Sequence, residues 1–475
     1  MPEQVWSQVI DSLDTMPSGR YFRQVECFHP VLLQSRVYPE MAEAEVQQAR
    51  GAFDPKLGLE QRQKNFDDKT YWDDLYPSLK VPTWLGADLK LDYLQTEGEF
   101  LNPEQSVPED GLIGLGITLP VGRNLFIDAR RADLRQAKLM RDLRRADQLQ
   151  MANNLRLKAA LAYVEWYRSY RLEQLQREAV EVTRDQNEYV FALIEAGETA
   201  GIDSLKAAAQ LSKRQIEYRE AQVKRQNATL GASVYIWDSS GQALFLEERT
   251  QPGLPFMRNL TPPGSDALDT LVEAARRRNP KLNQLRTKNR QLEIDRQLAT
   301  ENLKPVFDVS FTWLHGGSQE PQEWSGATID QDYKMAISAS MPALLRKERG
   351  KLNLTQLKLL ENRLAQKDTE RKVANELRQF ANEWNNLEGQ LSQQRELVSN
   401  YYDLLEAERE KFGIGESDLL LVNLRLQQWV DSRQKEVALE AKLYKARCYT
   451  FWSAGFSPFY PELRISDPIL ELESD

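Results

Sequence analysis

Two long stretches of the chain contain no proline, and they constrain the fold more than any other feature. They run from Val121 to Gln251 and from Ala343 to Ser457. Proline breaks the interior of a helix because it lacks a backbone N–H and clashes with the preceding turn. Stretches of this length therefore permit very long helices, and we expect one from about Asn124 to Glu195 and another from about Arg346 to Lys411.

The same landmarks occur twice in the same order, which indicates an internal duplication. Trp166 stands about thirty residues before Gly197, and Trp384 stands about thirty residues before Gly415. A strand-like segment that ends in an apolar residue and a proline precedes each long stretch. The predicted organisation is a first repeat over residues 1–232, an intervening segment over 233–275, a second repeat over 276–455 and a C-terminal tail over 456–475.

An apolar seam with alternating three- and four-residue steps follows the second stretch. It consists of Val373, Leu377, Phe380, Trp384, Leu387, Leu391, Val398, Tyr401, Leu405 and Phe412. Only Gln394 and Glu408 interrupt the seam, whose spacing is typical of a helix packed lengthwise against a partner.

Glycines near the end of each long helix favour a turn and a returning helix. Asp203-Ser204 and Ser417-Asp418 are the candidate caps of the two returning helices, because short polar side chains can accept hydrogen bonds from free backbone N–H groups. The sequence therefore predicts two long helical hairpins.

Four shorter segments alternate apolar and polar residues, as strands with one apolar face do. They cover residues 85–93, 112–119, 307–313 and 333–341. Their apolar side includes Ile113, Leu115, Ile117, Phe307, Val309, Phe311, Met335 and Ile337. Two interpretations stay open at this point: the apolar faces could form the core of a soluble sandwich, or they could face lipid in a membrane barrel. Four strands cannot close a pore, so a barrel needs several chains.

The composition argues against several classes of function. A net charge of -9 disfavours a nucleic-acid partner, and two cysteines with two histidines are too few for a disulfide framework or a histidine or cysteine metal centre. The sequence has no glycine-rich phosphate loop or nucleophile elbow, so we expect no enzyme, no catalytic residue, no cofactor and no metal. We also find no apolar run long enough for a membrane-spanning helix, and no secretory signal at the start.

The ordered set of motifs resembles the TolC-type outer-membrane efflux protein family over roughly residues 28 to 456. Residues 412–423 (FGIGESDLLLVN) are similar to the family's second hairpin tip, and residues 196–205 (AGETAGIDSL) are similar to its first. The resemblance implies an α+β membrane protein in which long coiled-coil helical hairpins form an α-barrel. It also implies that each chain contributes four strands to a trimeric twelve-stranded β-barrel, with an equatorial belt around residues 240–275.

The implied function is a passive export duct of a tripartite efflux or type I secretion system, located in the outer membrane and periplasm. The implied partners are the other copies of a homotrimer, a periplasmic adaptor (membrane fusion) protein, an inner-membrane pump and outer-membrane lipid. The alternative is a soluble coiled-coil scaffold or tether, which fits the seam and the acidic charge but leaves the alternating strands unexplained.

The resemblance also points to candidate functional residues at the hairpin tips. The candidate gate or pore residues are Asp203, Glu416, Asp418, Leu420 and Leu421, and the candidate adaptor contacts are Gly197, Glu198, Thr199, Gly415, Glu416 and Ser417. The family often carries a carboxylate six residues after the tip glycine. Asp203 occupies this position in the first repeat, whereas Leu421 occupies it in the second. A closed tip could therefore be sealed by carboxylates or by apolar side chains that exclude water.

Overall fold

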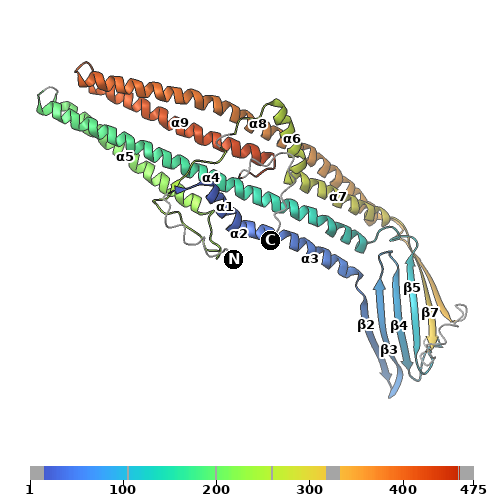
Figure 1. Cartoon of the computed structure of the whole chain (residues 1–475). Helices are drawn as coiled ribbons and strands as arrows, with labels where there is room; N and C mark the ends of the chain where they lie inside the picture. The colour runs from blue at the N-terminus through green and yellow to red at the C-terminus, as the bar shows by residue number, and fades with distance from the viewer. Residues whose placement is uncertain are drawn as a thin grey trace. The chain divides into compact units, whose positions relative to one another are not determined.

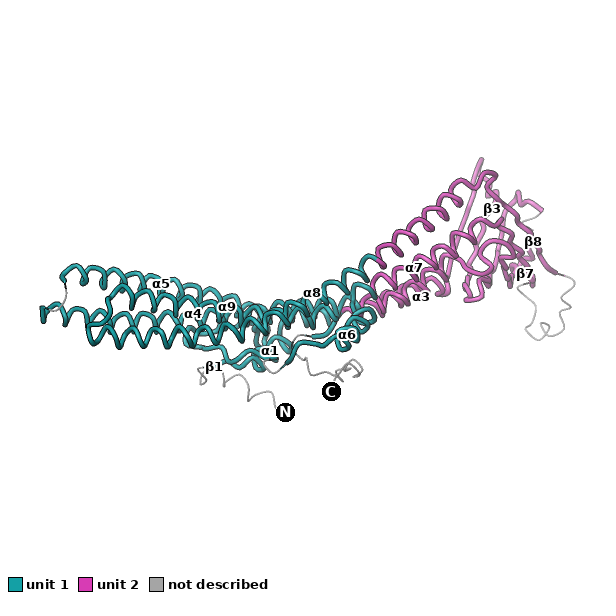
Figure 2. Tube along the Cα trace, turned by 90° about the horizontal axis from the view of Figure 1, so that it is seen from above, with its two compact units in different colours: residues 1–37, 146–283, 368–475 teal, residues 38–145, 284–367 magenta. Residues whose placement is uncertain are grey.

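The chain divides into two compact units, and each unit is assembled from separate stretches of sequence (Figure 2). The computed structural model describes residues 15–103, 106–197, 200–257, 260–316, 332–457 and 459. Unit 1 comprises residues 1–37, 146–283 and 368–475, and unit 2 comprises residues 38–145 and 284–367. Both units contain segments from both predicted repeats, because the long helices α4 (Ala129–Glu195) and α8 (Arg346–Gly413) each contribute to both units.

Two long helical hairpins make up most of unit 1. Helix α4 is followed by α5 (Gly201–Ser233), and α8 is followed by α9 (Leu419–Ser453). The two turns lie at the same end of the unit (Figure 1). The predicted long helices are confirmed. Helix α4 ends at the predicted Glu195 but begins at Ala129 and not at Asn124, and α8 begins at the predicted Arg346 but ends at Gly413 and not at Lys411.

Much of the predicted apolar seam of α8 is buried, with different partners along its length: α6 (Ser265–Arg278) at Leu377, α9 at Trp384, and both α4 and α9 at Leu405. Leu377, Trp384 and Leu405 are 0, 2 and 2% exposed, respectively. Trp384, Leu387 and Leu391 pack against Leu439 and Leu443 of α9. Because burying one leucine side chain contributes about 1.5–3 kcal/mol, a seam of this length stabilises the hairpin strongly.

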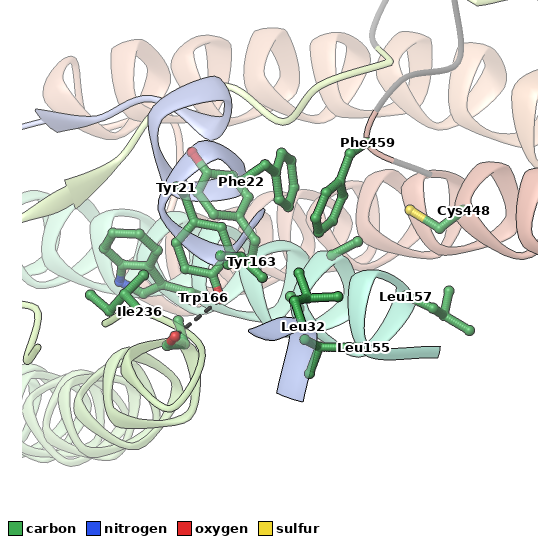
Figure 3. Close-up of a cluster of buried hydrophobic side chains, with 14 of the residues drawn as sticks. Tyr21, Phe22, Leu32, Leu155, Leu157, Tyr163, Trp166, Ile236, Cys448 and Phe459 are labelled. Carbon is green, nitrogen blue, oxygen red and sulfur yellow. Dashed lines mark hydrogen bonds between the residues drawn. The ribbon is translucent and has the colours of Figure 1, made fainter. Parts of the chain in front are cut away.

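The N-terminal segment packs onto the middle of the hairpins in unit 1, although its sequence shows no interpretable pattern. It forms β1 (Thr15–Met16), α1 (Ser18–Phe28) and α2 (Pro30–Arg36), and β1 pairs in parallel with β6 (Gln251–Pro252). Tyr21 and Phe22 of α1 are buried with Tyr163 and Trp166 of α4 (Figure 3). The Tyr21 hydroxyl donates a hydrogen bond to the Ala232 carbonyl at 3.0 Å. Helix α6 (Ser265–Arg278) also belongs to this unit.

Unit 2 contains one antiparallel sheet together with helical segments. The helices are α3 (Tyr38–Arg50), the short η2 (Gly51–Phe53), most of α7 (Pro280–Glu301) and the first turns of α4 and α8. The strands are β2 (Lys56–Phe66), β3 (Lys69–Pro82), β4 (Asp88–Glu97), β5 (Leu112–Pro120), β7 (Val306–Gly316) and β8 (Tyr333–Ser340). They lie in the order β2-β3-β4-β5-β7-β8, and every neighbouring pair is antiparallel.

The described sheet has six strands, two more than the four alternating segments that the sequence predicts. The four predicted strands correspond to β4, β5, β7 and β8. The sequence does not predict the hairpin β2–β3, because much of it lacks the alternation of apolar and polar residues. Gln61, Arg62, Gln63 and Lys64, for example, place polar side chains on both faces. The first predicted strand also begins too early, since the Thr83 backbone N–H donates to the Ala87 carbonyl in a turn that precedes β4.

Three further observations apply to the described residues only. None of the helices there combines the length and apolar character required to cross a membrane. No group of three or more His, Cys, Asp or Glu side chains in the same part of the chain is arranged to hold a metal ion. Cys27 and Cys448 are both free thiols.

Candidate functional site

The candidate site is the end of unit 1 where the two hairpin turns lie side by side. The rings of Tyr189 on α4 and Phe412 on α8 meet edge to face, with centroids 5.8 Å apart. Val190, Ala207 and Leu419, from α4, α5 and α9, form a buried apolar cluster beneath the turns. These contacts hold both turns at one end of the unit.

Gly197 and Gly415 each occupy a turn and adopt a left-handed backbone conformation. Their φ angles are +78° and +77°, a region that side chains with a Cβ rarely adopt. A Cβ at either position would meet no atom within 4 Å. The requirement for glycine therefore comes from the backbone conformation and not from close packing.

The first turn differs from the prediction at its helix cap. Ala200 is the N-cap of α5 and offers no capping side chain, so the predicted cap at Asp203-Ser204 is wrong. The helix begins earlier than predicted, at Gly201, directly after Ala200, whose backbone is extended. Asp203 instead lies in the first helical turn, where a carboxylate is favoured by the helix dipole, and it pairs with Lys206 at 2.8 Å. Glu198 and Thr199 lie outside the described residues.

The second turn confirms the predicted cap at Asp418. The Asp418 carboxylate accepts a hydrogen bond from the Leu421 backbone N–H at 2.8 Å, as the N-cap of α9. The Ser417 hydroxyl donates to the Glu408 carboxylate at 2.5 Å, and Arg425 of α9 approaches the same carboxylate at 3.6 Å.

Both polar interruptions of the apolar seam join α8 to the α9 side of the hairpin. Glu408 contacts Ser417 and Arg425, and the buried Gln394 amide donates to the Ser432 carbonyl at 2.9 Å. The sequence shows these positions as breaks in the seam but not their partners. A polar residue at a seam position is the signal that could have identified both contacts.

The candidate gate residues of the second hairpin point away from the buried core. Leu419 is 6% exposed and Val422 is 2% exposed, whereas Leu420 is 70% exposed and Leu421 is 38% exposed. Residues three apart share one face of a helix, so burial of Leu419 and Val422 turns the two intervening leucines outward. Glu416 and Asp418 are exposed as well. Two carboxylates and two leucines are therefore exposed at the second tip.

The eight candidate lipid-facing residues lie on one face of the unit 2 sheet. Ile113, Leu115 and Ile117 of β5 lie opposite His315, Trp313 and Phe311 of β7. Val309 and Phe311 lie opposite Ile337 and Met335 of β8, and Phe307 lies opposite Ala339. Leu115, Met335 and Ile337 are 46, 53 and 58% exposed, so this face stays partly open in the part of the chain that the structure describes.

The chain has the fold of solved outer-membrane channels. It matches the outer-membrane channel OprN with a TM-score of 0.68 at 14% identity, over 93% of this chain and 90% of that one. It matches the Campylobacter jejuni CmeC outer-membrane channel with a TM-score of 0.65 at 13% identity, over 92% and 86%. The open state of the Neisseria gonorrhoeae MtrE outer-membrane channel gives 0.66 at 11% identity, over 93% and 89%.

Identities this low establish the shared fold and nothing more. No protein-family model matches the sequence, and no curated protein matches it either. The predicted resemblance to TolC-type outer-membrane efflux proteins is confirmed at the level of the fold.

Proposed function

We propose that the chain is a passive export duct that spans the outer membrane and reaches into the periplasm. The observation that carries this proposal is the likeness to outer-membrane channels over 93% of the chain. In this role the protein supplies a path for its substrate and needs no catalytic residue of its own. Energy comes from a pump in the inner membrane.

The exposed apolar face of the sheet favours this duct over a soluble scaffold. A scaffold in water would leave Leu115, Met335, Ile337 and their neighbours on the same face exposed to solvent. Large apolar patches on protein surfaces usually mark interaction with another protein or with a membrane. In the duct, this face contacts outer-membrane lipid and the opposite, polar face lines the water-filled lumen.

A seam on α5 supports assembly into a homotrimer. Ile202, Ala209, Ile216, Val223 and Leu230 recur every seven residues, and all are exposed in the single chain. A seven-residue repeat of apolar side chains is what a helix presents to a lengthwise partner. Leu397 and Leu404 of α8, also seven apart, are 39 and 44% exposed. We propose that the α5 seam of one copy packs against this part of α8 in the next copy.

The hairpin tips are the proposed contact with the periplasmic adaptor and the proposed gate. Gly415, Glu416 and Ser417 form the second tip, where an adaptor that couples the duct to its pump would dock. Leu420 and Leu421 are the proposed apolar seal, since three copies of each around one axis can exclude water from a narrow pore. Asp203, Glu416 and Asp418 are the proposed carboxylates that influence ion passage.

Detergent extraction followed by mass determination tests the duct. The protein is expressed with a secretion signal, extracted from membranes and measured in detergent, and the purified particle is then added to planar bilayers. We expect a detergent-dependent trimer that conducts ions. A monodisperse monomer or dimer that stays in buffer without detergent would exclude the duct and leave the scaffold as the better account.

A further inference from the structure

Near the start of β2, the hairpin β2–β3 has one apolar and one polar face, as the other four strands of the sheet have. One residue from each of the six strands forms a continuous apolar row on one face: Leu57, Leu79, Leu91, Leu115, Trp313 and Tyr333. Leu57 is 86% exposed, and Tyr333 at the other end of the row is 52% exposed. The apolar face proposed to contact lipid therefore extends over the Leu57–Leu59 end of the hairpin, and the same face continues as the polar residues Gln61, Gln63 and Asp73 toward the β2–β3 turn.

The opposite face carries a matching polar row. It consists of Lys56, Lys80, Lys90, Gly116, Thr312 and Lys334, again one residue from each strand. Lys80 pairs with Asp88 at 2.9 Å, and Lys90 pairs with Asp92 at 3.5 Å. A row of lysine side chains requires contact with water. The hairpin therefore presents its polar side to the same lumen as the four other strands.

The hairpin also covers the edge of β4. A barrel with four strands per chain would need this edge free, so that it could pair with another copy. Strand β3 pairs with β4 at both ends of β4, from Asp88 opposite Pro82 to Glu97 opposite Asp73. In a twelve-stranded trimer, β4 of one copy would instead have to pair with β8 of the next. The edges that remain free in the described sheet are β2 and β8.

The two free edges are compatible with each other. Six antiparallel strands place β2 and β8 in opposite directions, so the β8 edge of one copy can extend the β2 edge of another as a further antiparallel pair. The apolar residues of both edges lie on the same face of the sheet. They are Leu57 on β2 and Tyr333, Met335 and Ile337 on β8. Pairing would also satisfy edge backbone groups, which cannot remain exposed in lipid.

We infer that β8 of each copy pairs with β2 of the next, so that six strands from each of three copies form an eighteen-stranded membrane wall. This inference rests on the proposed duct and replaces the twelve strands that the family resemblance implies. Barrel diameter grows roughly in proportion to strand number, so the pore is about 1.5 times as wide as one with twelve strands.

Lipid quenching of a fluorophore at single cysteines tests whether the hairpin is part of this wall. In a Cys27→Ser background, one probe each is attached to Leu57→Cys, Leu79→Cys and Leu115→Cys, and the labelled trimer is placed in vesicles with spin-labelled acyl chains. Lys56→Cys is the matched control, because Lys56 is the neighbour of Leu57 on the opposite face. Quenching by aqueous iodide is measured on the same samples.

We expect acyl-chain quenching at Leu57→Cys and Leu79→Cys equal to that at Leu115→Cys, with Lys56→Cys quenched by iodide instead. If Leu115→Cys alone responds to the spin-labelled chains, the hairpin lies outside the membrane and the eighteen-stranded wall is excluded, while the duct stands. If Leu115→Cys is not quenched by lipid either, the proposed duct itself fails. Because each substitution changes one exposed or half-exposed side chain, the test does not depend on a deletion that the fold has to tolerate.

Discussion

At the scale of single residues, the two cysteines differ in environment although their side chains are the same. Cys27 is exposed, whereas Cys448 is 1% exposed in the apolar cluster around Tyr163. Burial raises the pKa of the Cys448 thiol to about 12. The thiolate is the reactive form of cysteine, so Cys448 is protected both by lack of access and by protonation.

We therefore expect a maleimide to label one thiol per folded chain at pH 8 and two after denaturation. At that pH only about one in ten thousand Cys448 thiols is ionised, on the basis of a pKa of about 12. The measurement is the mass of the labelled protein, and the control is Cys27→Ser, which should take up no label until it unfolds. Labelling of folded Cys27→Ser would show that the cluster opens on the timescale of the reaction.

At the scale of elements, Asp418 combines a structural role with a proposed functional one. Its carboxylate caps α9, and its charge is one of the candidates for influencing ions at the tip. Replacement by alanine removes both properties at once. Replacement by asparagine removes only the charge, because asparagine is as good an N-cap as aspartate.

We expect Asp418→Ala to destabilise the start of α9 by about 1 kcal/mol and Asp418→Asn to leave it unchanged. Hydrogen exchange at the Leu421 amide, which donates to the cap, measures this effect. Cation block of single channels in bilayers measures the charge effect, and there we expect Asp418→Asn to weaken the block. Block unchanged in Asp418→Asn would remove this carboxylate from the gate and leave Leu420 and Leu421 as the seal.

At the scale of the whole molecule, the α5 seam makes the assembly testable without disturbing the fold of one chain. Ile216 and Val223 are 59 and 54% exposed in the single chain, so charges there are readily solvated in the monomer. In the proposed trimer they are covered by the next copy, and burying an unpaired carboxylate costs several kcal/mol.

We expect Ile216→Glu combined with Val223→Glu to shift the detergent-solubilised particle from trimer to monomer while the helix content stays the same. Gln215→Glu is the control, since it adds the same charge to an exposed residue about a quarter of a turn from the seam. Size-exclusion chromatography with light scattering reads the assembly state, and circular dichroism reads the helix content. A double variant that remains trimeric would show that α5 does not form the interface between copies.

Local patterns in the sequence predicted the helical hairpins and the four alternating strands. The seam through Leu377, Trp384 and Leu405 repeats with the period of a helix, and the alternation around Leu115 repeats with the period of a strand. Gly197 and Gly415 mark the turns because few other residues adopt their backbone conformation. Each of these signals comes from residues close together in sequence, and so it can be recognised without the rest of the fold.

Other features depended on contacts between distant segments, and only the tertiary structure decided them. The largely polar strand β2 forms because it pairs with β3. Helix α1 is held in place because Tyr21 packs against Tyr163 and donates a hydrogen bond to the Ala232 carbonyl. The partners of Glu408 and Gln394 likewise come from the return of α9. The sequence by itself determined the two long helical hairpins and four of the strands, because side-chain periodicity is local. The tertiary structure decided which segments join the sheet and the core, because that depends on the free energy of contacts between residues far apart along the chain.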